Sequence, residues 1–317
     1  MHAKAYQRCF LFIPVFFLLS PGILEAKVFK LYYLGGQSNM DGYGYVNELP
    51  SDLRGSVKGV MIFHGNTAPD GSEVDGRGLW AQLRAGHGRE FVSDGQTNTY
   101  SDRFGIELTF AWRLLKLEPD ANIAIIKYSR GGTSIDPRAA DRFGCWDPDY
   151  SAANGVNQYD HFLATIRHAF SDGDIDNDGE PDTLVPAGIV WMQGESDAAH
   201  GEEIAQRYQA HLKRLMDLIR AALRQDDLPV VMGRISDSGQ DADGKVWDHG
   251  DMVRNAQAMF VRSDGSAALV TTTDRYRYSD KWHYDTAGYI DLGRQFAQAL
   301  ARLHKQSEQQ RVRSGDQ

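Results

Sequence analysis

The sequence is poor in cysteine, since only Cys9 and Cys145 occur among its 317 residues. A disulfide-stapled mini-domain is therefore excluded. Proline is also scarce, and its 10 residues leave no room for a long proline-rich linker. Basic charge is in the minority, because 34 Lys and Arg stand against 43 Asp and Glu. The net charge of −9 argues against a general nucleic-acid-binding protein, which needs a basic surface to meet phosphates.

The sequence also lacks a long apolar run, and its most apolar segment is a short one near the N-terminus. Lys4 and Arg8 precede the run 9–19, and the small residue Ala26 follows it. This order is typical of a secretory signal peptide, here residues 1–26, whose removal would take Cys9 with it. The run falls short of the roughly 20 residues that a membrane-spanning helix needs, although a retained N-terminal anchor is the alternative. We expect a secreted or periplasmic protein with no stable membrane insertion once the signal is cleaved.

What the chain does have is an alternation of two hydrophobic patterns. Apolar runs of strand length occur at 28–34, 57–63, 122–128, 187–192, 229–235 and 269–273. Stretches with helical spacing lie between or after them, at 106–117, 159–170, 204–223, 252–260 and 287–303. This alternation predicts one α/β domain over 27–304, with a central parallel sheet and helices on both faces. The long loops 64–101 and 133–158 are candidates for function, and the polar tail 305–317 is predicted to be disordered.

Short polar motifs follow four of these predicted strands. They are Gly-Gln-Ser-Asn-Met at 36–40, Arg-Gly-Gly-Thr at 130–133, Gln-Gly-Glu-Ser-Asp at 193–197 and Asp-Lys-Trp-His at 280–283. Because ligands bind beyond the carboxyl ends of strands in an open parallel sheet, we expect the four motifs to converge on one site.

The residue types in these motifs suit acyl transfer. Ser38 follows two glycines and precedes a predicted helix start, where its hydroxyl can act as a nucleophile if a base takes its proton. His283 is the candidate base, and Asp280, three residues earlier, can hold the imidazole Nδ1–H. The backbone N–H groups of Ser38 and Gly131 and the side-chain amide of Gln193 are candidate donors to the oxyanion. Taken singly, each motif is also explained as a helix cap or a tight turn.

In this order, the motifs resemble those of the SGNH hydrolase superfamily, and within it the sialate O-acetylesterase-like group, carbohydrate esterase family 6. The resemblance spans residues 28–303. It implies a flavodoxin-like three-layer α/β/α sandwich, Ser38, His283 and Asp280 as the catalytic residues, and Ser38 and Gly131 as oxyanion donors. The superfamily has Asn where this chain has Gln193, so the third donor is less secure. Gly132 is an alternative to Gly131.

The resemblance further implies a serine esterase that removes acetyl groups from acetylated poly- or oligosaccharides, such as acetylxylan or O-acetylated sialic acid. No metal or organic cofactor is needed for that chemistry. Candidates for contacting the substrate are Arg130, Glu195 and Trp146. Each has an alternative: Arg130 can form a local salt bridge, Glu195 can order its own loop, and Trp146 can pack its loop onto the body of the protein. Two other functions stay open: a catalytically silent carbohydrate-binding protein, and an esterase for aryl or lipid esters.

An acidic loop at 172–182 is a candidate for structural calcium. Asp174, Asp176 and Asp178 alternate before Gly179, as in the first half of a calcium-binding loop. The twelfth position from Asp174 is Val185, without the bidentate glutamate, so the segment is not an EF-hand. A solvated acidic loop is the alternative interpretation.

Overall fold

A central sheet dominates the structure, a computed structural model that describes residues 26–66, 75–151 and 156–315. Its strand order is β11-β10-β9-β1-β8-β3-β4, and every neighbouring pair is parallel except the antiparallel edge pair β3 and β4. The strands of this sheet are β1 (Val28–Gly36), β3 (Val60–His64), β4 (Trp80–Gln82), β8 (Asn122–Ser129), β9 (Thr183–Met192), β10 (Val230–Gly233) and β11 (Ala267–Val270).

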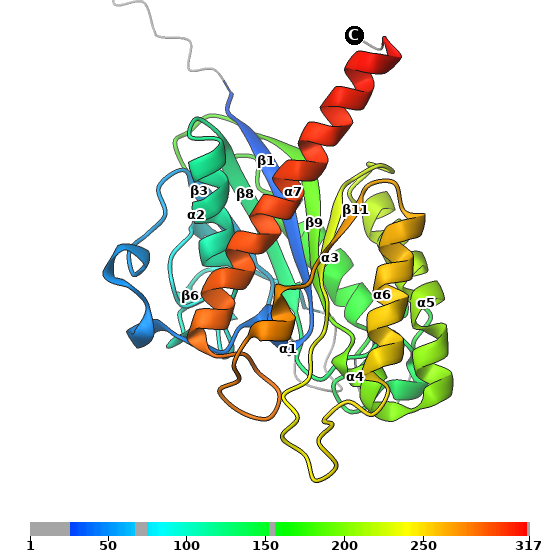
Figure 1. Cartoon of the computed structure of the whole chain (residues 1–317). Coiled ribbons are helices and arrows are strands. Elements are labelled where there is room, and N and C mark those ends of the chain that lie inside the picture. The colour runs from blue at the N-terminus through cyan, green and yellow to red at the C-terminus, as the bar shows by residue number, and fades with distance from the viewer. Residues whose placement is uncertain (1–25, 67–74, 152–155, 316–317) are drawn as a thin grey trace, which may run out of the picture.

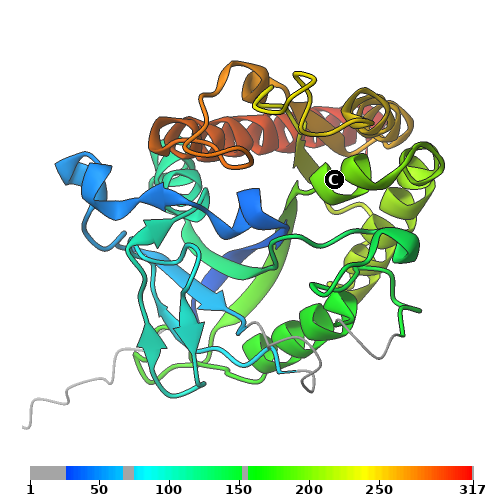
Figure 2. The same cartoon turned by 90° about the horizontal axis from the view of Figure 1, so that it is seen from below.

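Helices cover both faces of the sheet, as Figures 1 and 2 show. Helices α2 and α7 pack against each other on one face, and α3 packs on β8 from the other. Helices α5 and α6 pack together beside β10 and β11. The bounds are α1 (Ser38–Asp41), α2 (Glu107–Leu117), α3 (Gln158–Phe170), α4 (Glu195–His200), α5 (Glu202–Ala222), α6 (Gly250–Ser263) and α7 (Thr286–Ser314).

This architecture confirms the predicted three-layer α/β/α class. Each of the six predicted strands and five predicted helices overlaps an observed element. The strands β8-β1-β9-β10-β11 run in the order 2-1-3-4-5 when numbered along the chain, which is the flavodoxin-like order. Strands β3 and β4 extend the sheet beyond β8. The central strands β1 and β8 are buried almost throughout, because helices cover both of their faces.

Two predictions about the loops and the termini need correction. The tail predicted to be disordered from 305 is helical as far as Ser314, where α7 projects beyond the sheet (Figure 1). It is rich in Gln, Glu, Lys and Arg, which favour helix, and lacks proline and glycine before Gly315. The loop 64–101 contains β4 and the two short strands β5 (Val92–Ser93) and β6 (Asn98–Thr99). The predicted signal peptide lies outside the described residues, apart from Ala26.

Two further short strands, β2 (Gly44–Tyr45) and β7 (Arg103–Phe104), pair beside the carboxyl ends of the central strands. Single-turn 3₁₀ helices complete the described elements at Val46–Glu48, Ser51–Leu53, Pro137–Ala139 and Thr272–Arg275. No helix in the described ranges is both long and apolar enough to cross a membrane.

Candidate active site

Ser38 lies where β1 ends and α1 begins. Gly36 is needed just before it: at φ +144°, a Cβ there would lie 1.9 Å from the carbonyl oxygen of Met192 on β9. The Gln37 N–H donates to that same Met192 carbonyl over 2.8 Å. This close approach of the two backbones places Ser38 beside the carboxyl ends of both β1 and β9.

His283 and Asp280 have the geometry that their spacing predicts. The His283 Nδ1 lies 2.7 Å from Asp280 Oδ2, and Asp280 Oδ1 accepts the backbone N–H groups of Trp282 and His283. Burial lowers the pKa of His283, and the Asp280 carboxylate only partly offsets this. Burial also acts to raise the pKa of Asp280, but the bonds from His283 and Trp282 outweigh it and leave that pKa below its usual value. The pair is therefore built to hold a neutral imidazole with Nε2 as the base.

The two motifs meet across the end of the sheet. The Asn39 side-chain amide donates to the Trp282 carbonyl over 3.2 Å, which ties α1 to the turn that carries His283. Ser38 and His283 are each 8% exposed, so both are largely buried yet reachable. Among the described residues, no hydrogen bond joins the Ser38 hydroxyl to the His283 ring. Catalytic bonds of this kind often form only when substrate is bound.

Gly131 lies beside the nucleophile. A Cβ built on it would be 3.2 Å from Ser38 Cβ and 3.3 Å from Asp41 Oδ2. Gly132 instead has φ +76° and packs against the Phe143 ring. Gly131 therefore lies nearer to Ser38 than Gly132 does, and its backbone N–H interacts with the Asp41 carboxylate. The oxyanion roles of the Gly131 and Ser38 N–H groups stay predictions.

Gln193 is not available as the third donor in this structure. It is fully buried, and its amide donates to the Thr133 carbonyl over 3.1 Å and to Asp197 Oδ2 over 2.6 Å. Its Oε1 accepts from the Tyr208 hydroxyl. Because a buried amide must find partners, the side chain is used inside the protein and not in the cavity.

The structure places the three candidate substrate-binding residues in different surroundings. Arg130 lines the cavity beside Gly131. Trp146 is fully buried, and its indole N–H donates to Thr133 Oγ1 over 2.9 Å, so it holds its loop and cannot stack on a sugar. Glu195 is 2% exposed and accepts from the Asn39 amide over 2.8 Å, which supports the alternative that it orders the loop. Burial raises the pKa of Glu195.

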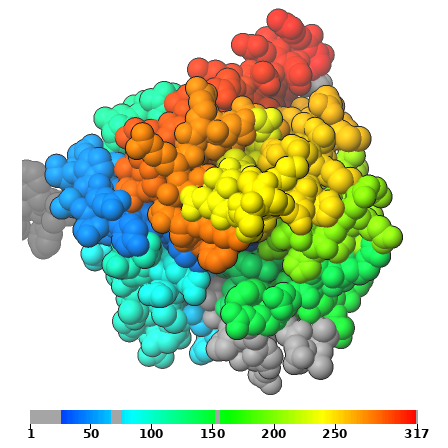
Figure 3. Space-filling view, turned by 60° about the horizontal axis from the view of Figure 1, so that its bottom comes forward, coloured from blue at the N-terminus to red at the C-terminus, as the bar shows by residue number. Residues whose placement is uncertain are grey.

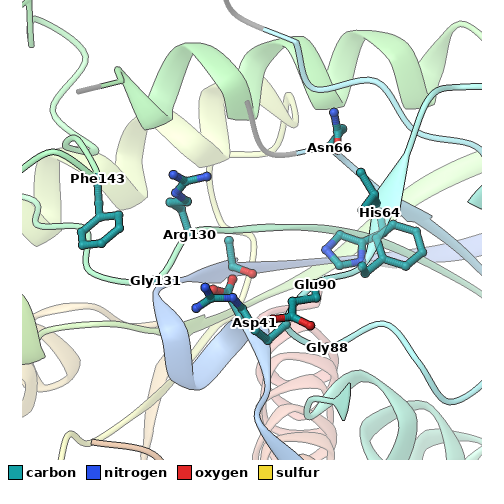
Figure 4. Close-up of a pocket in the computed structure, with 12 residues that line it drawn as sticks. Asp41, His64, Asn66, Gly88, Glu90, Arg130, Gly131 and Phe143 are labelled. Atoms are coloured by element: carbon teal, nitrogen blue, oxygen red, sulfur yellow. The ribbon is translucent and has the colours of Figure 1, made fainter. Parts of the chain in front are cut away.

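A cavity of about 310 Å³ lies beside Gly131, the neighbour of Ser38, but neither Ser38 nor His283 is among the residues that line it. Figure 3 shows the molecule from this end, with a recess where the cyan and green segments meet. Figure 4 shows Asp41, Glu90 and Gly131 close together, with Phe143 and Arg130 on one side and His64 and Asn66 on the other. Arg89 also lines it. The cavity thus mixes aromatic, cationic and anionic groups.

Sequence reasoning missed several residues of this site. Arg89, His64 and Asn66 lie in or beside the loop 64–101, whose length was the only signal for them. Phe143, and not Trp146, is the aromatic residue of the second long loop that lines the cavity. Trp282, inside the Asp-Lys-Trp-His motif, is 48% exposed next to His283.

A buried ion pair lies under the nucleophile. Lys127 and Glu107 are both fully buried and joined at 2.8 Å. The Lys127 ammonium also donates to the carbonyls of Asp41 over 2.9 Å and of His87 over 2.7 Å. Lys127 therefore holds the end of α1, where Asp41 is the last residue.

The acidic loop forms a group that differs from the predicted one. Asp174, Asp176 and Asp182 bring carboxylate oxygens within 4.8 Å of one another. Asp178 is not part of this group, and its carboxylate pairs with Lys27. Asp176 Oδ1 and Asp182 Oδ1 are buried without a hydrogen-bond partner, and oxygen donors of this kind fit Ca²⁺. Lys27 also bonds Asp176, so a cation already neutralises part of the cluster. The fit is therefore compatible with calcium, which stays a prediction.

The chain matches one family over nearly its whole described length. Residues 28–302 match the family described as carbohydrate esterase, sialic acid-specific acetylesterase. No sequence among the curated proteins matches the chain significantly.

Solved structures with a similar fold include three proteins of low sequence identity. A protein from Arabidopsis thaliana is 20% identical in sequence and has a TM-score of 0.57, and the match covers 86% of this chain and 98% of the Arabidopsis chain. A carbohydrate acetylesterase from Xanthomonas citri is 15% identical with a TM-score of 0.58, covering 86% of this chain and 56% of its own. NanS is 16% identical with a TM-score of 0.56, covering 90% of this chain and 100% of its own. These likenesses show the fold.

Proposed function

Because the chain belongs to the carbohydrate esterase family of sialic acid-specific acetylesterases, we propose that it removes O-acetyl groups from carbohydrate through Ser38, His283 and Asp280. The family makes it a carboxylic ester hydrolase. The observation that carries the proposal is the 2.7 Å bond between His283 Nδ1 and Asp280 Oδ2, at the same end of the sheet as Ser38.

The chemistry follows from these atoms. His283 Nε2 takes the Ser38 proton as the hydroxyl oxygen attacks the acetyl carbon, and Asp280 stabilises the imidazolium that forms. The N–H groups of Ser38 and Gly131 donate to the oxyanion. His283 then protonates the sugar oxygen as its bond to the acetyl carbon breaks, which frees the sugar hydroxyl and leaves an acetyl-Ser38 ester. In the second half, His283 takes one proton from water as the water oxygen attacks the ester carbon. The bond to the Ser38 oxygen then breaks, His283 returns the proton to that oxygen, and acetic acid leaves and ionises to acetate.

A sugar substrate is supported by the surroundings of Ser38. Trp282, exposed beside His283, and Phe143 in the cavity offer flat faces of the kind that pack on sugar rings. Arg89 and Arg130 supply hydrogen-bond donors, and Asp41 and Glu90 supply acceptors. This balance suits a ligand with many hydroxyl groups better than a lipid chain.

The decisive experiment measures acetate release from acetylated xylan, acetylated monosaccharides and O-acetylated sialic acid. We expect wild type to release acetate from at least one of them and Ser38→Ala to release none. Ser51→Ala, at an exposed serine on a surface turn, is the matched control and should behave as wild type. Equal release by wild type and Ser38→Ala refutes the nucleophile. Binding of the sugars without hydrolysis favours the silent binding protein, and hydrolysis of aryl or lipid esters alone favours the third function.

Secretion is part of the same proposal. Residues 1–26 are proposed to be removed during export, which would start the mature chain at Lys27. N-terminal sequencing of protein recovered outside the cytoplasm tests this. A mature chain that still begins at Met1 contradicts it.

A further inference from the structure

Tyr43 lies face to face with the imidazole of His283. The two ring centroids are 3.5 Å apart and the planes differ by 6°. Tyr43 follows Ser38 by five residues on the same segment. Gly42 makes this possible: it ends α1 at φ +95°, and a Cβ there would lie 2.2 Å from the Cα of Gly105. The turn that presents the nucleophile therefore also delivers a ring to the base.

Tyr43 is itself held from two sides. The Arg89 guanidinium donates to the Tyr43 hydroxyl, and its Cζ lies 5.7 Å from the ring centroid. The Arg89 backbone N–H donates to the Gly42 carbonyl over 2.9 Å. On the other side, Arg103 donates to the Tyr43 carbonyl over 2.8 Å. The ring and its backbone are thus both fixed by arginines that come from outside the motif.

The two contacts on His283 restrain different motions. Asp280 bonds Nδ1 in the plane of the imidazole, which leaves the ring able to tilt about that bond. A flat ring packed on one face removes the tilt. We propose that Tyr43 is a positioning residue for His283, and that the face of its ring does this work. The inference rests on the proposed function, since it assumes that His283 acts as the base.

The charges around His283 give the arrangement a second consequence. The carboxylates of Asp280, on its own turn, and of Asp41, on α1, raise the pKa of His283. Burial and the Arg89 guanidinium lower it. Removal of the Arg89 charge therefore raises that pKa, and the acid side of the rate profile moves to higher pH, because the base must be neutral to act.

Three variants test the proposal, with kcat and KM measured separately on an acetylated substrate. Tyr43→Leu removes the flat ring and should lower kcat by about 10-fold to 100-fold with little change in KM, because small misplacements of a reacting group are costly. Tyr43→Phe keeps the ring and should stay within about threefold of wild type. Arg89→Gln should move the acid limb of kcat to higher pH.

Tyr100→Leu is the matched control, because Tyr100 is also a partly buried tyrosine with an arginine, Arg84, over its ring. It should keep the wild-type kcat. A Tyr43→Leu enzyme with the wild-type kcat overturns the proposal, and so does a Tyr43→Phe enzyme as impaired as Tyr43→Leu. If Tyr43→Leu does not fold, Tyr43→Phe decides: because it keeps the ring, a Tyr43→Phe enzyme whose kcat falls by tenfold or more refutes the positioning role. Wild type without esterase activity would refute the proposed function instead, which keeps the two failures apart.

Discussion

Asp280→Asn is the most informative single change, because it alters one property of the site and preserves the rest. The amide keeps an oxygen for the two backbone N–H groups that Asp280 Oδ1 accepts, at 2.7 and 2.8 Å. It replaces only the charge that faces His283 Nδ1 at 2.7 Å. An amide nitrogen there can donate to Nδ1, which then leaves the proton on Nε2 and removes the base.

The magnitude follows from the exposure of the carboxylate. General-base catalysis contributes roughly 10² to 10⁴ in rate. The Asp280 side chain is 42% exposed, so water weakens its interaction with the imidazolium and favours the lower end of that range. We expect kcat to fall about 100-fold, which corresponds to about 2.7 kcal/mol of transition-state stabilisation.

The assay is acetate release under saturating substrate, with the unfolding midpoint in urea measured in parallel. Asp280→Ala is the companion variant, since it also removes the acceptor for both N–H groups and should lose about 1–2 kcal/mol of stability besides the activity. If Asp280→Asn keeps a rate within about threefold of wild type while Ser38→Ala is inactive, Asp280 does not serve the base, and the proposed triad is wrong.

Four further outcomes are expected. The pH profile of kcat/KM should reach its acid half-maximum below the ordinary imidazole value of about 6.5, because burial lowers the pKa of His283; a midpoint above it contradicts this. Trp282→Ala should raise KM for a polysaccharide about tenfold with kcat retained, and an unchanged KM would show that the indole does not contact the sugar. Lys127→Met should cost about 3–5 kcal/mol in urea unfolding by leaving Glu107 buried and unpaired, and a double variant that also carries Glu107→Leu should recover much of it; a stable single variant refutes the reasoning. Calcium at 100 times its Kd should stabilise the fold by about 2.7 kcal/mol and raise Tm by about 5 °C, and Asp182→Asn should weaken the effect; an unchanged Tm after chelation contradicts a bound ion.

The sheet could be predicted from the sequence because strands that are buried on both faces consist mostly of apolar residues. Strands such as β1 and β8 are mostly apolar, because helices on both faces of the sheet bury them almost throughout. The proposed nucleophile, Ser38, closely follows such a strand, while the proposed acid and base, Asp280 and His283, lie in the loop region between β11 and α7. Their neighbourhood then follows from the strand order alone.

The rest of the site depends on contacts that leave no periodic pattern. Tyr43 and Arg89 are 46 residues apart in the sequence, and they meet only because the loop that carries Arg89 passes the end of α1. Trp146 was assigned to the substrate because aromatic residues in loops often bind sugars, yet the loop folds so that its indole is buried against Trp191. Whether a loop aromatic side chain faces inward or outward is decided by tertiary packing, and composition does not record it.

The Gln-Gly-Glu-Ser-Asp motif shows how a strand-end motif can serve an active site without facing it. Asp197 accepts the backbone N–H groups of Ile135 and Asp136, and Gln193 donates to the Thr133 carbonyl, so both bind the loop that follows Gly131. Glu195 bonds Asn39, the residue after the nucleophile. These are charged or amide groups whose desolvation must be offset by bonds of good geometry, so they tolerate few arrangements of the backbone around them. The motif therefore fixes the loop that follows Gly131 and the turn that carries Ser38 relative to each other, so the alignment of the two proposed oxyanion donors depends on side chains that are buried away from the cavity.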